Sequence, residues 1–297
     1  MSRPALLAPR DLAGLAAALA RATPDSRLIA GGTDLMLQWR ESTSRPDLLI
    51  DLSAMGELSF IRKEGRSIRI GAMTTFAQLQ GDALLQRDAA CLAAAAAHVG
   101  SEQIRNVATI GGNVANASPC ADSIPALLVL GADVGVLDAS GRITRHALYD
   151  VMEGADGQRI EPNEAIVDFS FPALSAMERS AFGKVGARSS VAVAKLNAAM
   201  IVRLDETHRR IDEVRIAFGS IAPKAFVDDD VVAALRGGPV DDAAIEAFVE
   251  ACTQLVDRSI PKRGSARYKR RAIRGLAGDL CAAVFTRAAD SPAIAAV

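Results

Sequence analysis

The sequence predicts an α+β protein in two parts. Up to residue 172, short segments of helical composition alternate with short segments in which apolar and polar residues alternate, as in half-buried strands. From residue 192 onward, strand-like segments come first and two long helical segments follow, which is typical of a smaller α+β domain. Half of the 297 residues are hydrophobic, 23% are charged and the formal net charge is −1. This is the composition of a globular protein with a sizeable core.

The first part contains helices and strands whose ends are marked by breakers and caps. Residues 11–20 consist mainly of Ala and Leu, which favour a helix, and Pro24 lies in the turn that ends it. Thr74 or Thr75 is available to cap the next helix. Pro125 lies in the first turn of a later helix, where its missing N–H costs nothing. Helices are expected at residues 11–20, 75–85, 88–99 and from 123, and strands at residues 27–30, 46–52, 67–71, 132–137, 142–144 and 166–172.

The second part begins after a linker expected at residues 173–179. A polar turn at residues 205–209 separates its two strands. Its elements are two strands and then two helices, expected at residues 192–204, 213–219, 241–255 and 265–287.

Several classes of protein are disfavoured by composition and by missing motifs. No run approaches the roughly 18 apolar residues of a membrane-spanning helix, and the first residues lack the pattern of a secretion signal, so we expect a cytoplasmic protein. The net charge of −1 gives no electrostatic reason to bind nucleic acid or an anionic membrane. The sequence has no G-x-S-x-G, H-E-x-x-H or P-loop segment. Such a chain fits chemistry that is carried by a cofactor.

The cysteines and histidines do not form the close groups that metal sites need. Cys91, Cys120, Cys252 and Cys281 are far apart and form no C-x-x-C pair, so we expect reduced thiols and neither an iron–sulfur cluster nor a zinc site. The three histidines are also widely spaced. We therefore expect no catalytic and no metal-ligating residue in this chain.

Two glycine-rich segments are candidate ligand sites. The first, Leu28–Leu35 (LIAGGTDL), is a strand that runs into two adjacent glycines. Because glycine has no Cβ and accepts positive φ, paired glycines let backbone N–H groups approach a diphosphate, and Thr33 adds a hydroxyl donor. The alternative interpretation is a plain tight turn.

The second segment, Thr109–Asp122 (TIGGNVANASPCAD), is rich in small and hydrogen-bonding residues and is too long for a hairpin, so we expect a ligand-lined loop. Asp122 either caps the helix that begins at Ser123 or accepts hydrogen bonds from ligand hydroxyls. Neither segment is the G-x-G-x-x-G fingerprint, so a Rossmann site is not supported. The other side chains suited to bond a ligand here are Thr109, Asn113, Asn116 and Ser118.

These segments resemble a known family. LIAGGTDL, followed downstream by RNVATIGGNVANASPCADSIPALLVLGA, is similar to the FAD-binding (medium) subunit or domain of the molybdenum hydroxylases, the xanthine dehydrogenase and carbon monoxide dehydrogenase family. AFGKVGARSSVAVAKLNAAM, IAFGSIAP and RGSARYKRRAI resemble stretches of the C-terminal domain of the same flavoproteins. The resemblance covers nearly the whole chain in the same order.

The resemblance implies a fold and domain boundaries. The expected fold is an FAD-binding domain of the vanillyl-alcohol-oxidase-like (PCMH) type with two subdomains, followed by a smaller α/β C-terminal domain with a β-sheet and helices. The FAD-binding domain would take residues 1–176, with subdomains at about 1–55 and 56–176, and the C-terminal domain residues 177–297. FAD is expected to lie in an extended form between the domains.

The resemblance also implies which residues hold FAD. Two segments would cradle the diphosphate, Asp122 would contact the polar portion of FAD, and Ile166 and Lys184 would lie near the flavin ring. A cation near the ring helps stabilise reduced, anionic flavin. Without the resemblance, Lys184 would be interpreted as a solvated surface lysine. The expected cofactor contacts are Leu28, Ile29, Ala30, Gly31, Gly32, Thr33, Asp34, Leu35, Thr109, Ile110, Gly111, Gly112, Asn113, Ser118, Asp122, Ile166 and Lys184.

Partner subunits follow from the same resemblance. In this family, substrate is hydroxylated at a molybdenum–pterin centre on a large subunit, and electrons pass through two [2Fe–2S] clusters on a small subunit to FAD. We therefore expect a molybdopterin-binding and a [2Fe–2S] partner, a dimer of heterotrimers, NAD⁺ or another acceptor, and a purine or other N-heterocycle as substrate. The alternatives are a stand-alone FAD-dependent oxidase and a non-redox nucleotide-binding assembly protein. The basic run at residues 262–274 either docks a partner or is a solvated helix face.

Overall fold

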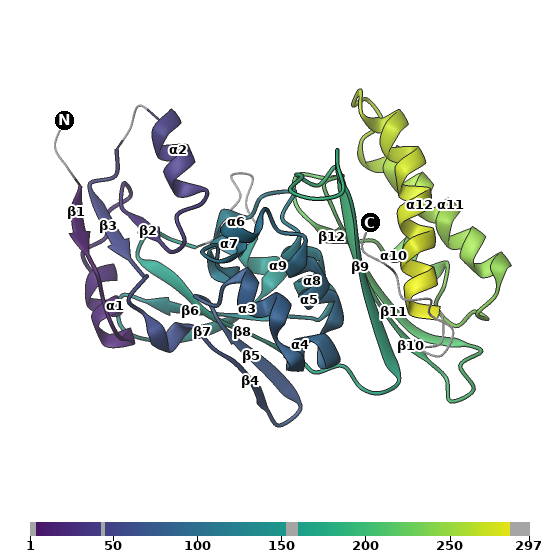
Figure 1. Ribbon diagram of the computed structural model, residues 1–297, viewed down its shortest axis with the longest axis horizontal. Helices are drawn as coiled ribbons and strands as arrows, with labels where there is room; N and C mark the ends of the chain where they lie inside the picture. Colours follow the sequence, from purple (N-terminus) through teal and green to yellow (C-terminus); the bar gives the residue numbers. More distant parts are fainter. Residues whose placement is uncertain (1–3, 43–44, 153–159, 286–297) are drawn as a thin grey trace. The chain divides into compact units, whose positions relative to one another are not determined.

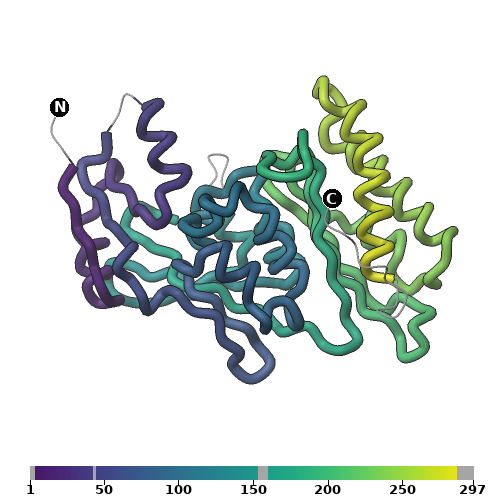
Figure 2. Tube along the Cα trace, viewed as in Figure 1, coloured from purple at the N-terminus to yellow at the C-terminus, as the bar shows by residue number. Residues whose placement is uncertain are grey.

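The computed structural model describes residues 4–42, 45–152 and 160–285 (Figures 1 and 2). The chain is divided into two compact units whose segments alternate along the sequence. Unit 1 comprises Met1–Leu84, Ser101–Ser118 and Gly131–Ala173, and unit 2 comprises Leu85–Gly100, Pro119–Leu130 and Leu174–Val297. The units are not two consecutive halves of the sequence, and the predicted domain boundary at residue 176 stays a prediction.

The first sheet of unit 1 has three parallel strands in the order β1-β3-β2. Asp11 caps the first helix by accepting a hydrogen bond from the N–H of Gly14 at 2.7 Å. Leu15 and Leu19 of that helix are fully buried in one core with Ile50 of the central strand. The elements are β1 (Ala5–Leu7), α1 (Leu12–Leu19), β2 (Arg27–Ile29), α2 (Leu35–Glu41) and β3 (Leu48–Asp51).

The second sheet of unit 1 has five antiparallel strands in the order β4-β5-β8-β6-β7. The strands are β4 (Ile61–Glu64), β5 (Ser67–Gly71), β6 (Asp133–Asp138), β7 (Ile143–Ala147) and β8 (Glu164–Pro172). The helical elements are η1 (Gly56–Leu58), α3 (Phe76–Gly81), α6 (Glu102–Arg105), α7 (Ile110–Asn116) and α9 (Leu148–Val151). The predicted cap at Thr75 is confirmed, because Thr75 and Gln78 form a capping box at the start of α3.

Unit 2 is built on a four-stranded antiparallel sheet with the order β12-β11-β10-β9. Figure 1 shows α11 and α12 lying side by side, in green and yellow. The strands are β9 (Glu178–Val185), β10 (Leu196–Leu204), β11 (Ile211–Gly219) and β12 (Phe226–Val227). The helices are α5 (Ala90–Ala97), α8 (Ser123–Val129), α10 (Asp229–Ala233), α11 (Asp242–Ser259) and α12 (Ala266–Phe285). Among the described residues, no helix is long and apolar enough to cross a lipid bilayer.

The central strand β10 of unit 2 is covered on both faces. Side chains alternate between the faces of a strand, so Ala198, Met200 and Val202 point one way, into the core that α11 and α12 complete. Asn197 points the other way, toward the start of α8, where it hydrogen-bonds Ala121 and Asp122. A polar side chain thus lies within residues 196–202 of β10, which are otherwise apolar and are all buried.

Two predicted helices have other bounds in the structure. The helix predicted at residues 75–85 ends at Gly81, because Asp82 takes an extended conformation with φ −79° and ψ 121°, and α4 (Ala83–Asp88) follows it. The helix predicted at residues 88–99 begins only at Ala90, after Ala89 with φ −157°.

Candidate functional site

The first glycine segment is a turn between β2 and α2 in unit 1. Gly32 has φ +69°, in the left-handed region that favours glycine. A Cβ on Gly31 would overlap the backbone carbonyl of Val107. Within residues 4–42, 45–152 and 160–285, no acceptor receives the backbone N–H of Gly31, Gly32 or Thr33. The segment is therefore a tight turn whose N–H groups remain available, as in backbone anion sites.

The first half of the second segment forms the helix α7 (Ile110–Asn116) rather than the predicted loop, and residues 117–122 connect it to α8 without regular structure. Thr109 caps α7 by accepting a hydrogen bond from the N–H of Gly112 at 3.1 Å. The N–H of Ile110 donates to the Thr74 carbonyl at 3.0 Å, and the N–H of Gly111 donates to the Ala72 carbonyl at 2.9 Å. These backbone donors are thus used inside unit 1. Small residues occur here partly because the helix packs tightly: a Cβ on Gly111 would lie 2.7 Å from the Cβ of Ala72.

The two segments lie side by side within unit 1. Gly31 packs against the backbone of Val107, just before α7. The position of a Cβ on Gly112 is 3.9 Å from the Cβ of Ala30. Farther along the two helices, Gln38 of α2 donates a hydrogen bond to the Oδ1 of Asn116 at 3.1 Å. The structure therefore brings together the two segments that the sequence predicted to share a ligand.

The remaining predicted residues of unit 1 are Ser118 and Ile166. Ser118 is half-buried and follows α7. Ile166 lies in β8 with 6% of its surface exposed and pairs with Val136 of β6, next to a β-bulge.

Asp122 and Lys184 belong to unit 2 and bond to each other. The Nζ of Lys184 lies 2.5 Å from the Oδ2 of Asp122, and the two side chains are 7% and 6% exposed. Lys184 also donates to the backbone carbonyl of His98 at 2.9 Å. Lys184 is therefore not the solvated surface lysine that its residue type alone suggests. Asp122 neutralises the charge of Lys184. The predicted role of Lys184 as a cation beside the flavin did not include this ion pair.

The carboxylate of Asp122 does not cap α8. Asp122 occupies the N-cap position, but its backbone is helical and its side chain makes no capping hydrogen bond. The Oδ1 accepts a hydrogen bond from the Nδ2 of Asn197 at 2.9 Å instead. Burial raises the pKa of Asp122, and the Lys184 ammonium and the Asn197 amide oppose that rise. Asn197 was missed by sequence reasoning; its only signal was a polar residue within an apolar strand.

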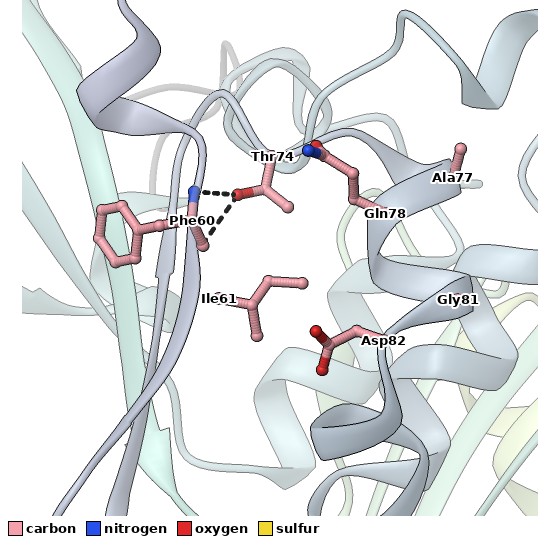
Figure 3. A pocket seen from close by; sticks show the side chains of 7 residues that line it. All are labelled: Phe60, Ile61, Thr74, Ala77, Gln78, Gly81 and Asp82. Carbon is pink, nitrogen blue, oxygen red and sulfur yellow. Dashed lines mark hydrogen bonds between the residues drawn. The ribbon is translucent and has the colours of Figure 1, made fainter.

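One pocket of unit 1 is lined by residues of α3 and of the segment at the start of β4 (Figure 3). It has a volume of about 410 Å³ and is open to solvent. Thr74 and Phe60 lie next to each other in its wall. The Thr74 hydroxyl accepts a hydrogen bond from the Phe60 N–H at 3.2 Å and donates one to the Phe60 carbonyl at 3.0 Å. None of the predicted cofactor contacts lines it; its lining residues are Phe60, Ile61, Thr74, Ala77, Gln78, Gly81 and Asp82. The pocket gives no support to a ligand site there.

The basic run at residues 262–274 is partly neutralised. Arg270 bonds to Asp257 of α11 at 2.7 Å, and Arg274 bonds to Glu246 of the same helix at 2.7 Å. Lys269 is buried and donates to the carbonyl of Ser220. These contacts tie α12 to α11 and to the end of the sheet.

Comparison with known proteins places the chain in a family. Residues 2–174 match the family described as "FAD binding domain in molybdopterin dehydrogenase", and residues 181–284 match the "CO dehydrogenase flavoprotein C-terminal domain". The chain belongs to the family of FAD-binding flavoprotein subunits of molybdenum hydroxylases, which are oxidoreductases. The predicted fold class and FAD as the cofactor of this chain are thereby confirmed.

Relatives of similar length show the same relationship. The "Nicotinate dehydrogenase FAD-subunit" of Eubacterium barkeri is 30% identical over 84% of this chain and 84% of its own length. The "Xanthine dehydrogenase FAD-binding subunit" of Escherichia coli O157:H7 is 31% identical over 83% of this chain and 84% of its own length. A structure of carbon monoxide dehydrogenase from Hydrogenophaga pseudoflava has a TM-score of 0.86 and 26% identity, over 96% of this chain and 98% of that one.

Proposed function

We propose that this chain accepts electrons from the [2Fe–2S] clusters of a small partner subunit and passes them through FAD to NAD⁺ or another acceptor. A molybdopterin-binding large subunit would oxidise the substrate, and the assembly would be a dimer of heterotrimers. Two relatives support a multi-subunit assembly by name: one is a "medium chain" of carbon monoxide dehydrogenase and another is subunit alpha of a dehydrogenase complex. A cytoplasmic location is part of the same proposal.

The observation that carries the proposal is the turn at Gly31 and Gly32. Its N–H groups have no acceptor among the described residues, and the missing Cβ of Gly31 lets the turn pack against the Val107 carbonyl. Such groups suit the two negative charges of a diphosphate, which FAD contains. The residues present therefore fit the cofactor. We assign the diphosphate contact to this turn, and to α7 only the exposed Gly112 with the side chains of Asn113 and Asn116.

Asp122 and Lys184 have a different role in the proposal. FAD supplies the redox chemistry because it accepts and releases electrons singly or in pairs. Since the Lys184 charge is balanced by Asp122, the pair presents no net charge to a ligand. A carboxylate repels a diphosphate and accepts hydrogen bonds from hydroxyl groups. We therefore assign Asp122 to the ribityl hydroxyls and Lys184 to holding Asp122.

The substrate of the complex is proposed to be a purine or another N-heterocycle. Relatives named for xanthine, nicotinate and nicotine support this class. Others are named for carbon monoxide and glyceraldehyde, so the flavin subunit does not select the substrate. A stand-alone oxidase is disfavoured because relatives that match most of this chain are named as an FAD subunit, an FAD-binding subunit or a medium chain.

The test is the visible spectrum of the co-purified complex, followed by identification of the released cofactor. We expect the two absorption bands of oxidised flavin, FAD after denaturation, and iron and molybdenum in companion subunits. Bleaching by substrate and recovery with NAD⁺ would support the proposed electron path. A colourless chain that takes up no added FAD would refute it, and a flavin that is reduced without companion subunits would favour the stand-alone oxidase.

A further inference from the structure

Three residues form a row across the sheet of unit 2. Lys184 of β9 is the register partner of Asn197 of β10, and Asn197 is the register partner of Gly219 of β11. Register partners on neighbouring strands point to the same face of a sheet. Lys184 and Asn197 both reach the carboxylate of Asp122 from this face, one at each oxygen.

The orientation of the Asn197 amide is fixed by its partners. Its Nδ2 donates to the Oδ1 of Asp122 at 2.9 Å and to the carbonyl of Ala121 at 3.2 Å. Both partners are acceptors, so only the amino end of the amide fits on this side. Asn197 therefore holds two consecutive residues just before α8. It is 1% exposed, so water does not compete for these bonds.

The amide oxygen of Asn197 has room only because residue 219 is a glycine. The Oδ1 of Asn197 is buried and has no hydrogen-bond partner in the described part of the chain. It lies against Gly219, where a Cβ would overlap it. A buried acceptor without a donor is destabilising, and here it accompanies the two bonds that the other end of the amide makes. Any side chain at position 219 would push Asn197 away from Asp122.

We infer that Asn197 is a positioning residue for FAD: with Lys184 it holds Asp122 in the one orientation in which its carboxylate meets the ribityl hydroxyls. Gly219 permits this arrangement by leaving room for the amide. The inference rests on the proposed contact between Asp122 and FAD. Asn197 does not touch the cofactor; it acts through Asp122.

The test separates a role at the cofactor from a role in the core of unit 2. The variants Asn197→Leu and Gly219→Ala are made in the complete complex. The control Thr253→Val removes a different buried polar group of unit 2, the hydroxyl of Thr253 on α11. Among the contacts described, this hydroxyl bonds only to the carbonyl of Val249, at 2.9 Å. The dissociation constants of FAD and of ADP are measured on the flavin-depleted complexes, together with the unfolding temperature without ligand. ADP has the diphosphate but lacks the ribityl chain.

We expect both Asn197→Leu and Gly219→Ala to weaken FAD binding about tenfold or more while ADP binding stays within about twofold, since one lost hydrogen bond to a charged group is worth about 1.5–3 kcal/mol. Thr253→Val should leave both constants unchanged. If FAD and ADP binding fall together, or if FAD binding is unchanged, Asn197 is only a core residue and the inference is wrong. A wild-type complex that does not bind FAD would instead refute the proposed function.

Discussion

Lys184 and Asp122 form an ion pair inside unit 2 in which neither side chain is more than 7% exposed. The family resemblance implied a separate contact with the cofactor for each of them. In the structure the two side chains bond to each other. Asn197 donates a further hydrogen bond to Asp122, and Lys184 donates one to the His98 carbonyl. Removing either charge would leave the other buried and uncompensated. Substitutions at these two positions should therefore lower the stability of the protein.

Lys184→Met should destabilise the protein by about 3–5 kcal/mol, because it leaves the Asp122 carboxylate buried without its cation. Urea unfolding of the purified protein measures this. The matched control is Arg203→Ala, which breaks the exposed pair with Glu213 at 2.9 Å and should cost less than about 1 kcal/mol. Equal losses in the two variants would show that the Lys184 pair is solvated and contributes no more than a surface contact.

Asp122 should make stability depend on pH in a defined direction. Its pKa in the folded chain is raised above the ordinary 3.8, chiefly by burial. The folded chain therefore holds a proton on this carboxyl at a pH where the unfolded chain has lost it. This group favours folding most below its unfolded pKa, and that contribution disappears as the pH rises through its folded pKa. Carboxyl carbon NMR should show the raised pKa, and Lys184→Met should raise it further. A pKa below 3.8 in the wild type would contradict this.

Gly31→Ala should destabilise unit 1 by about 1–3 kcal/mol and abolish FAD binding, because the added Cβ overlaps the Val107 carbonyl and moves the turn. Gly275→Ala is the matched control. Gly275 lies within α12, and nothing lies within 4 Å of an added Cβ. Gly275→Ala should raise the free energy of unfolding by about 0.5–1 kcal/mol, since alanine is more stable than glycine in a helix interior. Calorimetry measures the stability of both variants, and the flavin content measures FAD binding. A Gly31→Ala protein that still binds FAD and is yellow would show that the turn is not part of the FAD site.

The four cysteines should differ sharply in reactivity. Burial raises the pKa of the Cys91 thiol to about 11 and that of Cys281 to about 12, and the pKa of Cys252 is also raised by burial. Cys120 is only half-buried. Peptide mass spectrometry after brief iodoacetamide treatment at neutral pH should therefore find Cys120 alkylated first.

FAD should slow the alkylation of Cys120, because this residue lies between Ser118 and Asp122, two proposed cofactor contacts. ADP serves as the comparison ligand. Identical alkylation rates with and without FAD, in a protein that binds FAD, would place the cofactor away from this segment.

Local patterns in the sequence predicted most elements but not their contacts. The helix predicted at residues 11–20, the strand at residues 67–71 and the helix at Ser123 follow from composition, residue alternation and Pro125, and all are present. The helix α7 was missed because glycine and asparagine disfavour helices; it forms through a Thr109 cap and tight packing on Ala72.

The contacts of the candidate site could not be predicted for a different reason. The Asp122–Lys184–Asn197 bonds join residues far apart in sequence, and they depend on strand register, which a single sequence does not state. The turn after β2 needed only local information, two glycines after a strand, and the structure has a tight turn there. Its contact with a diphosphate stays a prediction.

The alternation of the two units along the chain also affects how the protein is made. Helices α5 and α8 belong to unit 2, yet they leave the ribosome before β9, β10 and β11 exist. Helices of this length are marginal in water until an apolar face is covered. Unit 1 likewise waits for β8, its central strand, near the end of its last segment. Unit 1 is complete once Ala173 has been synthesised, but unit 2 is not. The nascent chain therefore exposes the apolar faces of α5 and α8 until translation has passed Gly219, and chaperones or partner subunits can bind these faces during that period.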